Sequence, residues 1–268
     1  MPQSLSPAVY IIGAGPGDPE LLTLKAYRIL TQADVILYAN SLVPTQILED
    51  VRDDAELIPT GSQTLEEIIP LMGDRVRENK AVVRLHSGDL SLYSAIHEQI
   101  QALRAAEIPL ELIPGISAYQ DAAAKLGVEL TVPGLVQSII LTRISGRASA
   151  VPQAEELASL AAHKASLCLY LSARHVQTAQ DQLLQSYPAE TTVGICYRLG
   201  WPDEQIWVVP LDKMAEVTQE QQLIRTTLYV ISPALDGSQK SHSTARSRLY
   251  HPDHSHLFRP HSRRIEKL

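Results

Sequence analysis

Apolar runs of strand length alternate with segments of helical periodicity along most of the chain. The short runs are rich in β-branched and aromatic residues, and the segments after them repeat apolar residues every three or four positions. Strands are expected at 10–12, 33–39, 55–59, 81–86 and 110–113. Helices are expected at 20–30, 45–51 and 92–105, and two more helices are expected, one that begins at 64 and one that ends at 124. Glycine stands in three of the strand-to-helix loops, which predicts a parallel sheet that carries a ligand where its strands end.

A second α/β unit is expected after Pro133-Gly134, because this dipeptide punctuates secondary structure strongly. Strands are predicted at 138–142, 167–171, 192–197, 205–209 and 226–231, with a helix across 175–185 and a mixed sheet. The last residues lose the periodicity and gain Ser, His and Arg. We therefore predict an N-terminal domain at 1–134, a C-terminal domain at 135–235 and a basic tail at 236–268.

Composition narrows the class of protein. The chain has 268 residues, and its hydrophobic content of 45% is enough for one large or two medium cores. Cys168 and Cys196 are too few for a disulfide framework and lie in apolar runs, so buried, reduced thiols are expected. The N-terminus lacks a signal-like pattern, and no apolar run approaches the roughly 20 residues of a membrane helix. These features predict a soluble, cytoplasmic protein without membrane contact.

The charge is distributed unevenly. Residues 236–268 carry seven Lys/Arg and three Asp/Glu, so the total of −7 leaves −11 on residues 1–235. An acidic body is a poor surface for nucleic acid, and no such partner is expected.

The first glycine-rich loop is Gly13-Ala14-Gly15-Pro16-Gly17-Asp18-Pro19. Asp18 is a candidate N-cap and Pro19 a candidate first helical residue. The glycine spacing differs from the dinucleotide motif, and the prolines supply no N–H for a pyrophosphate. Asn40 also ends the second strand where a ribose-binding acid would stand. A cationic or neutral ligand suits this loop better than NAD.

Three further turns contain candidate ligand-binding residues. In Ser87-Gly88-Asp89, Gly88 permits close approach of a ligand, and Asp89 either accepts hydrogen bonds from an ammonium or ribose hydroxyl or caps the next helix. Pro114-Gly115-Ile116-Ser117-Ala118 is a small-residue turn or a helix start. Arg143 and Arg147 either bind carboxylates or form a solvated basic turn.

Together with residues 141–147, these segments resemble, in order and spacing, the tetrapyrrole methylases, which are the class III S-adenosylmethionine (SAM) methyltransferases. The resemblance covers about residues 8–235. Within the family, segments 37–43, 142–147 and 200–204 resemble the members that methylate carbon 11 (C11) of precorrin-4, with or without cobalt, in cobalamin synthesis.

The resemblance implies two α/β domains, a parallel-rich N-terminal sheet and a mixed C-terminal sheet, with SAM in the cleft between them. It also implies a trough for a tetrapyrrole substrate and a homodimer. The residues implied to bind SAM, or its product S-adenosylhomocysteine, are Pro16, Ser87, Gly88, Asp89, Leu92, Ser117, Ala118, Leu171, Gly200 and Thr227. Arg143 and Arg147 are implied to hold substrate carboxylates. The chain departs from the family at Leu90, where proline is usual.

Methyl transfer to carbon requires that a proton leave the macrocycle or move within it. His86, Asp89 and Tyr93 are the candidate bases, and water or the substrate itself are alternatives. His251, His254, His256 and His261 in the tail lack a carboxylate or cysteine ligand set, so no metal site is expected.

Other functions stay open at this point. They are a methylase acting at another ring carbon, a relative that modifies ribosomal RNA or diphthine, a non-catalytic SAM- or tetrapyrrole-binding module and, more remotely, a NAD-dependent enzyme. The sequence does not decide whether cobalt is in the substrate, which group accepts the proton, what the tail does, or the oligomeric state.

Overall fold

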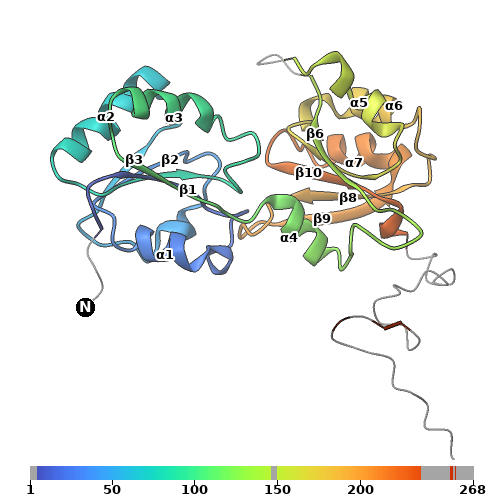
Figure 1. Cartoon of the computed structure of the whole chain (residues 1–268). Coiled ribbons are helices and arrows are strands. Elements are labelled where there is room, and N and C mark those ends of the chain that lie inside the picture. Colours follow the sequence, from blue (N-terminus) through green and yellow to red (C-terminus); the bar gives the residue numbers. More distant parts are fainter. Residues whose placement is uncertain (1–4, 146–149, 237–253, 256, 258–268) are drawn as a thin grey trace, which may run out of the picture.

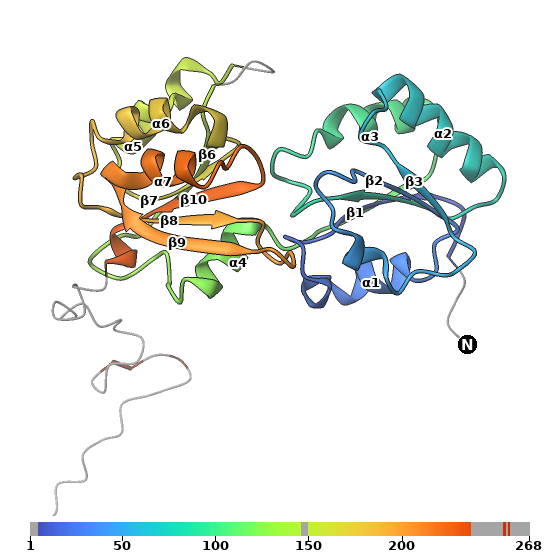
Figure 2. The ribbon, with the colours of Figure 1, turned by 180° about the vertical axis from the view of Figure 1, so that it is seen from behind.

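The computed structural model describes residues 5–145, 150–236, 254, 255 and 257. Two five-stranded sheets lie side by side, each covered by helices on both faces, and they form two lobes (Figures 1 and 2). The prediction of a parallel first sheet and a mixed second sheet is confirmed.

The first sheet is parallel throughout, in the order β3-β2-β4-β1-β5. Both faces of β1 are buried: Val9 and Ile11 pack toward α2 and α3, whereas Tyr10 and Ile12 pack toward α1. A strand covered on both faces needs a continuous apolar run, which the sequence supplies. The elements are β1 (Val9–Gly13), α1 (Leu24–Leu30), β2 (Val35–Tyr38), β3 (Glu56–Pro59), α2 (Leu65–Arg77), β4 (Val82–His86), α3 (Ile96–Ala105) and β5 (Leu110–Ile113).

The second sheet has the order β6-β7-β10-β8-β9, in which β6 and β7 are parallel and the other pairs are antiparallel. Helices α5, α6 and α7 pack on one face and α4 on the other (Figure 1). The elements are α4 (Ala118–Lys125), β6 (Ile139–Arg143), α5 (Leu157–Ala161), β7 (Ser166–Tyr170), α6 (Val176–Leu183), β8 (Thr192–Tyr197), β9 (Gln205–Pro210), α7 (Met214–Glu220) and β10 (Thr227–Ile231).

Helix α4 precedes the predicted boundary at 134 but packs on the second sheet. Ala122 of α4 belongs to the same buried cluster as Cys168 of β7 and Cys196 of β8. The domain limits themselves stay a prediction. Burial of both cysteines agrees with the sequence expectation.

Several helices differ from the predictions. Asp18 caps a single 3₁₀ turn, Pro19–Leu21, and Thr23 caps α1 separately, accepting from the Ala26 amide at 3.1 Å. The helix expected at 45–51 is a 3₁₀ turn, Thr45–Leu48. Helix α3 begins only at Ile96, because Tyr93 and Ala95 adopt left-handed backbone conformations. Helix α2 follows Thr64, as expected, with a capping box between Thr64 and Glu67, and it continues through Pro70. Helices α5 and α7 were not predicted.

No helix within the described ranges is long and apolar enough to cross a membrane.

Candidate active site

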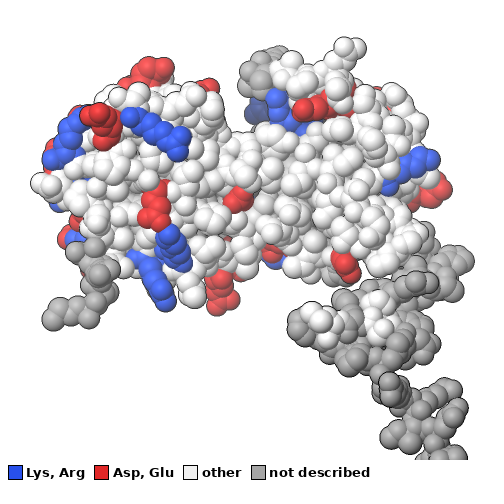
Figure 3. All heavy atoms as spheres, in the orientation of Figure 1, with Lys and Arg blue, Asp and Glu red and all other residues white. Residues whose placement is uncertain are grey.

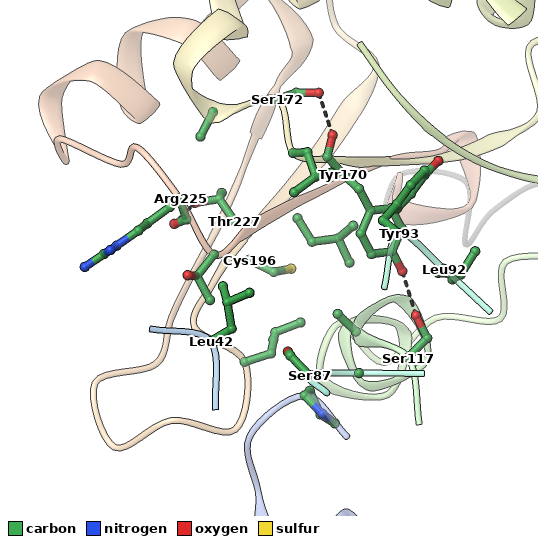
Figure 4. Close-up of a pocket in the computed structure, with 18 of the residues that line it drawn as sticks. Leu42, Ser87, Leu92, Tyr93, Ser117, Tyr170, Ser172, Cys196, Arg225 and Thr227 are labelled. Carbon is green, nitrogen blue, oxygen red and sulfur yellow. Dashed lines mark hydrogen bonds between the residues drawn. The ribbon is translucent and has the colours of Figure 1, made fainter. Parts of the chain in front are cut away.

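A pocket of about 380 Å³ lies between the lobes. On one side are residues that follow β1 and β4, at the carboxyl edge of the first sheet. The end of β7, the start of β10 and the start of α4 form the other side (Figure 4). The surface is also hollowed between the lobes in Figure 3, with basic side chains on the rim of the second lobe.

Glycines at the ends of β1, β4 and β5 let three loops meet at this edge. A Cβ on Gly115 would lie 2.3 Å from the Gly88 carbonyl oxygen and 2.6 Å from that of Gly13. Gly15 and Gly88 also exchange backbone hydrogen bonds of 3.1 and 2.7 Å. Side chains at Gly13 and Gly115 would force these backbones apart, so the site requires glycine there.

Asp89 joins two of these loops. Its Oδ2 accepts from the Gly115 amide at 3.2 Å, and its Oδ1 accepts from the Ser91 amide and hydroxyl. Burial by itself would raise the pKa of Asp89, but the hydrogen bonds from Ser91 and Gly115 outweigh it and lower the pKa. The alternative that Asp89 caps the next helix is wrong, because α3 begins at Ile96 after Ala95. Asp89 is an ionised carboxylate that lines the pocket and fixes its loops.

His86 is 9% exposed at the end of β4 and lines the pocket, and its Nε2 has no hydrogen-bond partner among the residues that the structure describes. Burial, with a smaller contribution from the neighbouring charge of Arg84, lowers the pKa of His86 to about 3. Burial also lowers the pKa of Arg84 to about 10, and its guanidinium donates to Thr60 and Gln99. His86 therefore presents a neutral imidazole at physiological pH.

Two tyrosines connect the lobes across the pocket. The Tyr170 hydroxyl, at the end of β7, lies 2.8 Å from Ser117 Oγ and accepts from the Tyr119 amide at 3.2 Å. The rings of Tyr93 and Tyr170 lie 5.6 Å apart between centroids (Figure 4). Burial raises the pKa of Tyr93 and raises that of Tyr170 to about 12, so both hydroxyls are protonated near neutral pH.

Nine of the ten predicted cofactor residues line this pocket. They are Pro16, Ser87, Gly88, Asp89, Leu92, Ser117, Ala118, Leu171 and Thr227. The candidate bases His86 and Tyr93 line it as well. Gly200 does not; it packs against the first glycine-rich loop, where a Cβ would lie 2.4 Å from the Asp18 nitrogen.

The predicted substrate arginine that the structure describes, Arg143, is not among the residues that line the pocket. Arg143 ends β6, and its guanidinium donates to the Ile144 carbonyl at 3.2 Å and the Ala150 carbonyl at 3.4 Å. Arg147 lies outside the described residues, as do His251, His256 and His261. Within the parts of the chain that are described, no group of three or more metal-binding side chains comes together.

Sequence reasoning missed several pocket residues. Tyr170 is the last residue of β7, and its place at the end of an apolar strand was the signal that could have identified it. Cys196 lines the pocket as a buried thiol whose pKa burial raises to about 12. Arg225 contributes to the lining, although its guanidinium extends away from the other side chains (Figure 4). The further missed residues include Leu42, Ser94, Ser172, Arg174, His175 and Leu199.

Comparison with known proteins identifies the class. The family described as Tetrapyrrole (Corrin/Porphyrin) Methylases matches residues 8–215. The chain therefore belongs to the tetrapyrrole methylase family.

Two relatives with named activities are similar to this chain over nearly its whole length. The chain is 40% identical over 252 residues to the precorrin-4 C(11)-methyltransferase of Pseudomonas aeruginosa, covering 94% of this chain and 98% of that protein. It is 38% identical to the cobalt-precorrin-4 C(11)-methyltransferase of Methanocaldococcus jannaschii, covering 94% and 95%.

Two solved methyltransferase structures superpose on this chain. A cobalt precorrin-4 methyltransferase superposes with a TM-score of 0.83 at 38% identity, covering 88% of this chain and 99% of that one. The uroporphyrin-III C-methyltransferase of Thermus thermophilus, complexed with S-adenosylhomocysteine, superposes with a TM-score of 0.71 at 28% identity, covering 85% and 98%.

Proposed function

We propose that this protein is a SAM-dependent C-methyltransferase that methylates C11 of precorrin-4, or of its cobalt complex, in the synthesis of the corrin ring. Three relatives that carry this activity in their names align with 94% of the chain. The observation that carries the proposal is the convergence of nine predicted cofactor residues on one pocket.

The residues of the pocket fit SAM. Its volume lies in the range of about 300–1,000 Å³ that is typical of small-molecule sites. The Asp89 carboxylate suits a ligand with an ammonium and a sulfonium, and the Nε2 of His86, which has no partner in the described part of the chain, offers a polar contact. Gly88 has a φ of 68° and open space where a Cβ would stand, which leaves its backbone accessible. Pro16, Ser87, Gly88, Asp89, Ser117 and Thr227 would hold the cofactor, which supplies an electrophilic methyl group on a sulfonium.

Most of the rate enhancement is expected to come from positioning. The loops that carry Asp89 and Ser117 are fixed by hydrogen bonds to Gly115 and Tyr170, so the lining enters the reaction already ordered. An electron-rich ring carbon forms the new bond to the methyl carbon, the sulfonium bond breaks toward sulfur, and one proton leaves the macrocycle or moves within it.

None of the three candidate bases has a pKa near neutrality. His86 is neutral with a pKa of about 3, Asp89 has a lowered pKa, and the raised pKa of Tyr93 keeps its hydroxyl protonated. A general base works best when its pKa lies near the working pH. We propose that these side chains contact and orient the ligands, and that water or the substrate itself takes the proton.

Substrate recognition is proposed to use arginine. Carboxylates on the edge of a tetrapyrrole suit the bidentate geometry of a guanidinium, and Arg143 and Arg147 remain the proposed partners. Further proposals are that the protein acts in the cytoplasm as a homodimer, with a small-molecule substrate and without nucleic acid. Covalent chemistry at Cys196 is not part of this proposal, because a thiol with a pKa of about 12 stays protonated.

The test is a methyl-transfer assay with the purified full-length chain, isotope-labelled SAM, and precorrin-4 or cobalt-precorrin-4 in separate reactions. We expect one labelled methyl group at C11 in the product, located by NMR, and release of S-adenosylhomocysteine. Label at another ring carbon would contradict the C11 assignment. Absence of transfer from protein that binds SAM and each substrate would favour a non-catalytic binding module.

A further inference from the structure

One side chain joins the backbones of the two lobes. Gln46, in the 3₁₀ turn Thr45–Leu48 of the first lobe, donates from Nε2 to the Gly17 carbonyl at 2.7 Å and to the Gly200 carbonyl at 2.6 Å. Gly17 belongs to the first glycine-rich loop, and Gly200 to the loop between β8 and β9 of the second lobe. Both acceptors are carbonyls, so the amide nitrogen must face them, since a flipped Oε1 would meet two oxygens.

The two loops that Gln46 joins are also in direct backbone contact. A Cβ on Gly200 would lie 2.4 Å from the Asp18 nitrogen, and a Cβ on Gly17 would lie 2.6 Å from Cδ1 of Trp201. Both glycines have positive φ, 75° and 159°. The two loops are packed too closely for a further side chain to fit between them. The hydrogen bonds of Gln46 therefore join two loops that are already tightly packed.

The loop of the second lobe is supported from behind. Glu204 accepts from the Gly200 amide at 2.5 Å and pairs with Lys125 of α4, which also pairs with Asp121 at 3.1 Å. The guanidinium of Arg198 lies 4.6 Å from the Trp201 ring centroid. The segment Gly200-Trp201-Pro202-Asp203-Glu204, which the sequence comparison singled out, thereby acquires a structural role: it presents a fixed carbonyl to Gln46.

Each joined glycine neighbours a residue of the pocket. Pro16 precedes Gly17, Leu199 precedes Gly200, and both line the pocket from opposite lobes. We propose that Gln46 is a positioning residue that sets the spacing of the lobes across the cofactor pocket. The effect on ligand binding rests on the proposed function, whereas the joining of the two loops does not.

The test measures the joining of the two loops and the effect on ligand binding separately. Trp201 contacts Gly17 at the junction, and the chain has two tryptophans, so a Trp207→Phe background leaves Trp201 as the sole reporter. In this background the variant Gln46→Glu keeps the shape of the side chain but replaces both donors with a carboxylate. Gln46→Ala is the second variant, for use if Gln46→Glu fails to fold by circular dichroism. The matched control is Gln32→Ala, whose amide donates to the Arg28 carbonyl on the surface of the first lobe.

Without ligand, we expect acrylamide to quench Trp201 more strongly in the Gln46 variants than in the Gln32 control. Titration with S-adenosylhomocysteine should then give a Kd raised about tenfold, as expected for losing one or two hydrogen bonds. Folded Gln46 variants with control-like quenching and a Kd within about twofold of the control would overturn the inference. If the unsubstituted protein does not bind S-adenosylhomocysteine, the proposed function fails, and the quenching comparison still decides whether Gln46 joins the lobes.

Discussion

At the scale of the residue, His86 illustrates how burial decides chemistry. It lies at the end of β4, two positions after Arg84, so both side chains leave the strand on the same face. Burial lowers the pKa of both groups, and the charge of Arg84 lowers that of His86 further. A neutral imidazole in the pocket wall contacts a ligand without adding charge.

This pKa gives a prediction for stability. The pKa of His86 is about 3 in the folded chain, against an ordinary value of about 6.5, so on acidification the unfolded chain takes up the proton first. The contribution of His86 to the free energy of unfolding is therefore complete above about pH 6.5 and is lost progressively toward about pH 3. Urea unfolding at about pH 7 and about pH 4.5 should show a larger loss for the parent protein than for His86→Gln. Equal losses in the two proteins would contradict a buried, neutral His86.

At the scale of the element, the strand ends of the first sheet determine the site. Strands β1, β4 and β5 are hydrogen-bonded neighbours, and each is followed by a loop that turns at glycine. Gly13, Gly88 and Gly115 are needed for different reasons: Gly115 sits between the backbones of the other two, whereas Gly88 has open space around its Cβ position and a φ of 68°.

The two kinds of glycine should respond differently to alanine. Gly88→Ala adds only the cost of a left-handed alanine, about 1 kcal/mol. Gly115→Ala places a Cβ 2.3 Å from a carbonyl oxygen and must shift the backbone, so we expect a loss above about 2 kcal/mol. Chemical denaturation of both variants measures the difference. A Gly115 variant as stable as the Gly88 variant would show that the loops are not packed as described.

Prediction from sequence worked where local pattern decides the structure. Buried parallel strands are continuous apolar runs, so β1, β4 and β5 were located closely, and the loops that follow them include the lining residues Pro16, Asp89 and Ser117. It failed where tertiary contacts decide. Because Tyr93 and Ala95 adopt left-handed conformations, α3 begins later than predicted. Helices α5 and α7 are too short to show a clear helical periodicity in the sequence. The contact of Gly200 with Asp18 joins residues far apart in the chain, which spacing alone does not reveal.

At the scale of the whole molecule, the pocket exists because two separately covered sheets meet at their edges. The first lobe contributes the loops of Pro16 and Asp89, and the second contributes Tyr170, Leu171 and Thr227. Contacts across this junction come from the rings of Tyr93 and Tyr170 and from Gln46. A ligand that touches both lobes should therefore bind the folded chain and stabilise it.

The most direct test of the account is isothermal titration of ligand-free protein with S-adenosylhomocysteine, using the parent chain, Asp89→Asn and the control Asp74→Asn. Asp74 forms an exposed ion pair with Arg77 on α2, away from the pocket lining. We predict binding by the parent and the control, and a Kd about tenfold higher for Asp89→Asn, or roughly 1.4 kcal/mol, because this variant removes the carboxylate charge that we propose faces the cationic end of the ligand. Absence of binding by the parent, or equal affinities for the two variants, would contradict a cofactor site at Asp89.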